Sequence, residues 1–189
     1  MYSKAMKVEK STIKRMICAA MFLAACLSVS SAHAASDTGT GKVVVVRPLT
    51  FINAQNLEFG DIIVGTTAGT LSVPPTGART STGGVTVVST SSFSPARFAG
   101  QGTVGQIVDI SVTRTSVNLT RTGGTETMAV DTFVVGSTPT VVLSPTPLNF
   151  RIGGTTGIFN FPVGATLRVG ANQAQGTYVG SFTISLNYQ

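Results

Sequence analysis

The chain has 189 residues, of which 42% are hydrophobic and only 11% are charged, and its formal net charge is +6. Five of the 13 basic residues and one of the seven acidic residues lie in the first 34 positions, so residues 35–189 hold eight basic and six acidic side chains, a net charge of +2. A surplus this small, scattered along the chain, argues against a nucleic-acid partner.

The first 34 residues have the three parts of a secretory signal peptide. Lysines and Arg15 precede an apolar stretch over residues 16–29, and Ala32-His33-Ala34 forms an A-x-A site. We therefore expect cleavage between Ala34 and Ala35, and export to the periplasm, the outer cell surface or the medium. The apolar stretch is shorter than the ~20 residues that cross a bilayer, and we expect no transmembrane segment in the mature protein.

Another interpretation of this leader stays open. Leu23-Ala24-Ala25-Cys26 is typical of a bacterial lipobox, in which the cysteine is lipidated and becomes the first residue of the mature protein. A lipid on Cys26 would anchor the protein to a membrane.

Residues 35–189 lack the side chains of several common catalytic and metal sites. Both cysteines, Cys18 and Cys26, and the single histidine, His33, lie in the leader. Disulfides, Cys/His zinc sites and Ser-His-Asp triads are therefore excluded. Glu126 and Asp131 are the late carboxylates that a hydrolase could pair, but they fit solvated hairpin positions better. We expect no enzyme, no metal site and no cofactor.

Short apolar segments alternate with turn residues throughout residues 35–189, and no helical spacing persists. Val108, Ile110 and Val112, for example, are separated by polar residues, which is typical of a half-buried strand. All 21 glycines lie in this part of the chain. The segments for which we predict strands are 42–47, 49–52, 57–59, 70–73, 84–88, 108–112, 117–119, 128–130, 133–135, 141–143, 148–152, 159–161, 167–169 and 176–189.

Many short strands at this spacing predict one all-β domain over residues 35–189. Because the strands alternate between apolar and polar positions, each has one dry and one wet face, as two packed antiparallel sheets require. We predict an immunoglobulin-like β-sandwich, with a closed β-barrel as the alternative.

The last fourteen residues, 176–189, are here called the terminal stretch. Its apolar residues fall on even numbers, so they point to one face of an extended strand. We expect this face to seat the stretch in the core and to form a strand-pairing site. The residues that carry this prediction are Gly176, Tyr178, Phe182, Ile184, Leu186 and Tyr188.

Residues 42–47, here called the valine segment, consist of Val43, Val44, Val45 and Val46 between Lys42 and Arg47. Apolar groups on both faces favour a strand between sheets. A flexible Gly/Ser/Thr-rich stretch precedes the segment, as a strand donated to another copy would need. Two interpretations stay open: the segment completes its own sandwich, or it pairs with a neighbouring subunit.

Two further motifs have an ordinary structural explanation. Residues 100–105 satisfy the phosphate-binding pattern G-x-G-x-x-G, but a predicted strand follows where that motif needs a helix, so we predict a turn. Arg79 lies between glycine turns, where an arginine either binds an anion or, more often, pins a loop through carbonyl groups.

Several short strings occur in a recognisable order: residues 57–62, 68–70, 77–80, 82–85, 128–133 and 163–169, continuing through Tyr188. Together they resemble the bacterial secreted family called domain of unknown function 4402. The resemblance implies a single exported, pilin-like β-sandwich without catalytic residues. Gly176, fourteenth from the end, and the penultimate Tyr188 also resemble the last strand of chaperone–usher pilus subunits, although the intrachain disulfide of those subunits is absent.

These observations favour an exported structural protein, a surface or fimbrial fibre subunit that interacts by β-strand addition. Its expected partners are copies of itself or a periplasmic chaperone and usher. The alternative is a free-standing secreted binding module, adhesin-like, with a small envelope or carbohydrate ligand. An exposed Trp or Tyr on a flat face would favour the module, but there is no Trp, and both tyrosines of residues 35–189 lie in the terminal stretch.

Overall fold

The computed structural model describes residues 38–136 and 139–189. The expected signal peptide, the cleavage site between Ala34 and Ala35 and the lipobox cysteine Cys26 lie outside these residues. Residues 44–189 form one compact unit, and the described residues before them, 38–43, belong to no strand.

The described part of the chain contains twelve strands and no helix, which confirms the all-β prediction. All strand pairings are antiparallel. The strands are β1 (Thr50–Gln55), β2 (Ile62–Val73), β3 (Thr80–Val87), β4 (Ala96–Gln101), β5 (Ile107–Val112), β6 (Ser116–Arg121), β7 (Thr127–Val135), β8 (Val141–Val142), β9 (Leu148–Arg151), β10 (Ile158–Val169), β11 (Tyr178–Val179) and β12 (Ile184–Tyr188).

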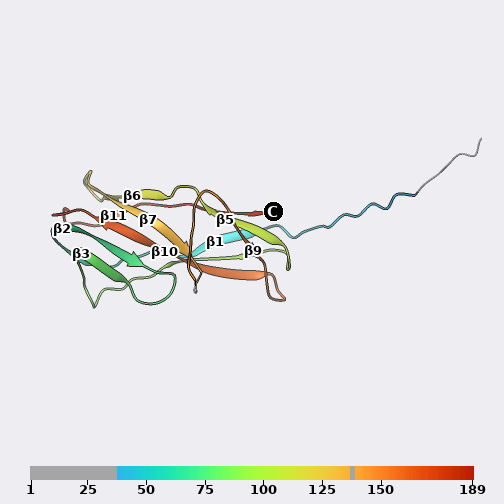
Figure 1. Ribbon diagram of the computed structural model, residues 1–189, viewed down its shortest axis with the longest axis horizontal. Coiled ribbons are helices and arrows are strands. Elements are labelled where there is room, and N and C mark those ends of the chain that lie inside the picture. The colour runs from blue at the N-terminus through green and yellow to red at the C-terminus, as the bar shows by residue number, and fades with distance from the viewer. Residues whose placement is uncertain (1–37, 137–138) are drawn as a thin grey trace, which may run out of the picture. The chain divides into compact units, whose positions relative to one another are not determined.

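The strands form two sheets (Figure 1). The larger sheet follows the order β1-β4-β10-β7-β6-β11; in addition β2 pairs with β10, β3 with β2 and β8 with β7. The smaller sheet has the order β12-β5-β9. β10, with 12 residues, is long enough to pair with β4, β2 and β7 and therefore organises the larger sheet.

Both sheets contribute to one hydrophobic core. Leu71 and Phe133 of the larger sheet are fully buried, and Ile110 and Ile184 of the smaller sheet belong to the same cluster. Since burying a large apolar side chain contributes about 1.5–3 kcal/mol, this shared core is what holds the two layers of the sandwich together. Aromatic rings connect across it: Phe51, Phe98, Phe133, Phe150, Phe159, Phe161 and Phe182 form a chain of ring contacts.

A bulge explains why β7 looks like two strands in the sequence. Met128 and Val130 are buried, but the next buried side chain is Phe133, so the inward positions change from even to odd numbers. Thr132 lies between them with φ of +52°, in the left-handed region, and the register with β10 shifts at the same place. An extra residue of this kind reverses the alternation along a strand.

Arg79 pins the loop that follows β3. Its guanidinium donates hydrogen bonds to the carbonyl oxygens of Phe59 and Val88 and to Ser91 Oγ, and it lies 5.1 Å from the ring centre of Phe93. The loop-pinning interpretation of this arginine is confirmed.

The glycine-rich residues 100–105, for which a turn was predicted, run from β4 into the turn before β5, and no helix follows them.

Candidate strand-pairing site

The terminal stretch is divided between the two sheets. β11 pairs with β6 in the larger sheet, residues 180–183 cross over, and β12 pairs with β5 in the smaller sheet. The prediction of one continuous strand over 176–189 was therefore wrong. The predicted alternation is nevertheless present: Ile184 is buried and Tyr178, Phe182, Leu186 and Tyr188 are half-buried, whereas Val179, Ser181, Thr183 and Asn187 are exposed.

Specific contacts hold the first half of this stretch. The Phe182 ring lies 4.9 Å from that of Phe133 and 6.2 Å from that of Phe98, between centroids. The Tyr178 hydroxyl donates a hydrogen bond to the carbonyl oxygen of Ala174 at 2.8 Å. Gly176 has φ of +145°, a backbone conformation that L side chains rarely adopt and that favours glycine.

The outer edge of β12 has unpaired backbone groups. Thr113 N donates to Thr183 O, and Gln189 N donates to Ile107 O, so the odd-numbered residues of β12 bond to β5. Because antiparallel bonding alternates, the N–H and C=O groups of Ile184, Leu186 and Tyr188 point to the opposite side. No strand of the described residues lies there. This edge is a template for another strand.

The Tyr188 side chain ties the end of β12 to the chain that leads into β1. Its hydroxyl accepts a hydrogen bond from Thr103 N and donates one to Arg47 O, both 2.8 Å long. Arg47 N in turn donates to Thr103 Oγ1 at 2.6 Å. The backbone that precedes β1 is thereby fixed at Arg47, beside the last residues of β12.

The valine segment forms no strand. Val43 is 84%, Val44 61%, Val45 88% and Val46 38% exposed, and β-structure begins only at Thr50. The prediction of a strand over residues 42–47 is therefore corrected, and the segment pairs with no described strand of its own sandwich. Pro48 separates the segment from β1, and proline lacks an N–H and restricts the residue before it, which prevents β1 from extending backwards as a regular paired strand.

The two carboxylates considered for a hydrolytic pair each bind an arginine instead. Arg121 Nε lies 2.7 Å from Glu126 Oε2, and Arg168 Nε lies 2.9 Å from Asp131 Oδ2. The hydrogen bonds from Arg121 lower the pKa of Glu126 from 4.5 to about 2. Both carboxylates are thus engaged in surface ion pairs.

A comparison with family models assigns the chain to a family. Residues 49–188, 140 of the chain's 189, match the family described as Domain of unknown function (DUF4402). The protein belongs to the DUF4402 family. The matched region contains every described strand of this DUF4402 protein and leaves out the valine segment. The chain matches no curated protein and no solved structure.

Within residues 38–136 and 139–189, no three His, Cys, Asp or Glu side chains gather where they could hold a metal ion. In this described part of the chain, no helix is long and apolar enough to cross a membrane.

Proposed function

We propose that this DUF4402 protein is an exported structural subunit whose copies associate by β-strand addition. One observation carries the proposal: within the described residues, the apolar strand former Val43 to Val46 pairs with no strand, and the outer edge of β12 has no partner strand. The valine segment can supply the added strand, and the β12 edge can supply the backbone partners for it.

The physical chemistry of the two parts is complementary. Valine is among the residues most enriched in strands, and its exposed side chains gain free energy when another surface covers them. The outward N–H and C=O groups of Ile184, Leu186 and Tyr188 can bond to the backbone of an added strand. Strand addition would therefore satisfy backbone groups and bury apolar surface in the same event.

The geometry of such a contact allows a chain of subunits. Donor and acceptor are different surfaces, so a one-way contact is head-to-tail, and a head-to-tail contact that does not close into a ring extends into a fibre. The hydrogen bond from Tyr188 to Arg47 fixes where the donor leaves its own domain. Export rests on the leader sequence, and a periplasmic chaperone would cover the β12 edge before assembly.

Deletion of the donor tests this proposal. Protein comprising residues 35–189 should elute as assemblies in size-exclusion chromatography with light scattering, and its unboiled SDS lanes should show a ladder that boiling collapses to one band. Removing residues 42–46 should give a folded monomer, because none of them belongs to a strand. Removing residues 38–41 instead is the matched control and should leave assembly intact.

A monomeric parent protein would contradict the proposal. So would a protein without residues 42–46 that still assembles.

A further inference from the structure

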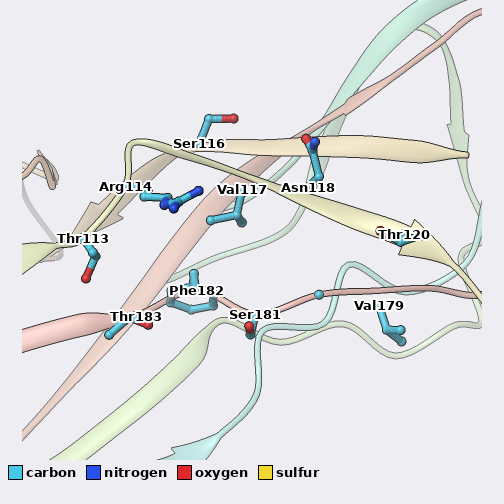
Figure 2. A pocket seen from close by; sticks show the side chains of 11 residues that line it. Thr113, Arg114, Ser116, Val117, Asn118, Thr120, Val179, Ser181, Phe182 and Thr183 are labelled. Atoms are coloured by element: carbon cyan, nitrogen blue, oxygen red, sulfur yellow. The ribbon is translucent and has the colours of Figure 1, made fainter. Parts of the chain in front are cut away.

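A groove with a volume of about 660 Å³ lies between β6 and the terminal stretch (Figure 2). Along one bank, Ser116, Asn118 and Thr120 are exposed on β6; along the other, Ser181 and Thr183 are exposed. Half-buried Val117 and Phe182 lie between the banks. The groove thus combines two polar rims with a small apolar floor.

Backbone groups add to the polar rim on the β6 side. Arg121 N donates to Glu126 O in the β6–β7 hairpin, whereas Thr122 N donates to Thr177 O on the other side, so the even-numbered residues of β6 face the terminal stretch. Of these, Thr120 pairs with Val179. In the described chain no backbone hydrogen bond joins Ser116 or Asn118 to residues 180–183, so their N–H and C=O groups face the groove unpaired.

The groove is closed at both ends, which decides what it can hold. At one end Thr120 pairs with Val179, and at the other Thr113 N donates to Thr183 O at 3.1 Å. A Cβ on Gly180 would come within 2.6 Å of Asn118 O, so the banks also approach each other closely near the first end. An extended peptide strand has no way through such an opening, whereas a compact ligand fits.

Arg114 supplies the charge of the site. Figure 2 shows its side chain reaching along the groove toward Val117. Arg121 and Arg168 are paired with carboxylates, but within the described residues the Arg114 guanidinium has no hydrogen-bond or ion-pair partner. A guanidinium binds a carboxylate through two parallel hydrogen bonds, which makes a carboxylate the natural complement of this end of the groove.

We infer that the groove binds a carboxylate-bearing sugar of the uronic acid class. The carboxylate lies on Arg114, the ring hydroxyls bond to the Ser181 and Thr183 side chains and to the free backbone groups of Ser116 and Asn118, and the C–H face of the ring packs on Val117 and Phe182. A few convergent polar groups around an apolar floor are what a small-ligand site requires. This site does not depend on strand association.

Calorimetric titration with galacturonic acid and its short oligomers tests the assignment. Binding should be saturable, should weaken when salt is added, and should be stronger than that of neutral galactose. Arg114→Gln should reduce the affinity roughly tenfold or more, because it removes a charge-assisted pair of hydrogen bonds. Arg97→Gln is the matched control: Arg97 is an exposed arginine of β4, outside the groove, and its loss should leave binding unchanged.

Any one of the following results would overturn the inference. These are the absence of saturable binding by the acidic sugars, equal weakening by Arg114→Gln and Arg97→Gln, or equal affinity for galacturonic acid and galactose. An acidic peptide that competes with the sugars and binds more tightly would also overturn it, because the ligand class would then be wrong.

Discussion

The valine segment and β12 are both built from strand-forming residues near the ends of the described chain, yet only β12 is part of a sheet. β12 alternates, so Ile184 is 6% exposed while Thr183, just before the strand, and Asn187 are exposed. The valine segment is apolar at four successive positions, and Val45 is 88% exposed. The difference teaches that strand propensity does not by itself place a segment in a sheet: a paired neighbour and one dry face are also needed.

The largest expected effect comes from truncating a buried side chain of β12. Ile184→Ala should lower the free energy of unfolding by about 3 kcal/mol, because it leaves a cavity in the shared core. Ile63→Ala, at an isoleucine of β2 that is 61% exposed, should change it by less than about 0.5 kcal/mol. Urea unfolding of both variants measures the difference. Equal losses would mean that β12 is peripheral.

Removing the Tyr188 hydroxyl, which connects the two regions, should have the next largest effect on stability. Tyr188→Phe removes the hydrogen bonds to Arg47 O and Thr103 N and should destabilise the protein by about 1–2 kcal/mol. Amide exchange at Arg47 should also become faster. In Tyr178→Phe, which loses the bond to Ala174 instead, exchange at Arg47 should stay as in the parent. Unchanged exchange at Arg47 in Tyr188→Phe would show that the Tyr188 hydrogen bonds do not hold the backbone that precedes β1.

A smaller, pH-dependent effect is expected beside β11, where Arg121 binds Glu126. The pKa of Glu126 is lowered from 4.5 to about 2 in the folded protein, so the pair's contribution to stability is complete above pH 4.5 and is lost as the pH falls toward 2. Glu126→Gln should therefore flatten the decline in unfolding free energy between pH 5 and pH 3, measured by urea unfolding. Parallel curves for parent and variant would contradict this.

The smallest effect on stability is expected in the valine segment itself. Val44 is 61% exposed, so Val44→Ala should change the unfolding free energy of the monomer by less than about 0.5 kcal/mol. Val112→Ala, at a position of β5 that is 1% exposed, removes two buried methyl groups and should cost about 1.5 kcal/mol. A substantial loss in Val44→Ala would indicate that the segment packs on its own domain after all.

Residue patterns predicted the fold class and most strands, because alternation of apolar and polar residues indicates a strand with one buried face, and turn residues indicate where strands end. β4 (Ala96–Gln101) escaped prediction, since Phe98 is its single large apolar residue and no β-branched residue follows. β2, β7 and β10 were predicted only in pieces. In β7 the cause is the bulge at Thr132, which reverses the alternation and depends on contacts with β10 that a single segment does not reveal.

The candidate sites were predictable in part. The inward face of the terminal stretch follows from its even-numbered apolar residues, but its division between two sheets depends on where β5 and β6 lie. The groove at Arg114 carries no sequence signal, because its banks are separated by about sixty positions in the chain and meet only through the pairings at each end. In the sequence, Ser116 and Asn118 look like ordinary solvated strand positions. Only the structure shows that β11 ends beside them and leaves their backbone groups unpaired.

Disulfide trapping between separate copies tests the central claim, that the valine segment of one copy pairs with the β12 edge of another. Residues 35–189 contain no cysteine, so single substitutions are unambiguous. Residues opposite each other on paired strands have Cβ atoms about 4.5–5.5 Å apart, close to disulfide range. Protein carrying Val44→Cys, Val45→Cys or Val46→Cys should form a mixed disulfide with Ser185→Cys on β12, at one register, and not with Asn149→Cys on β9. No mixed disulfide with Ser185→Cys, or equal yields with both acceptors, would contradict the account.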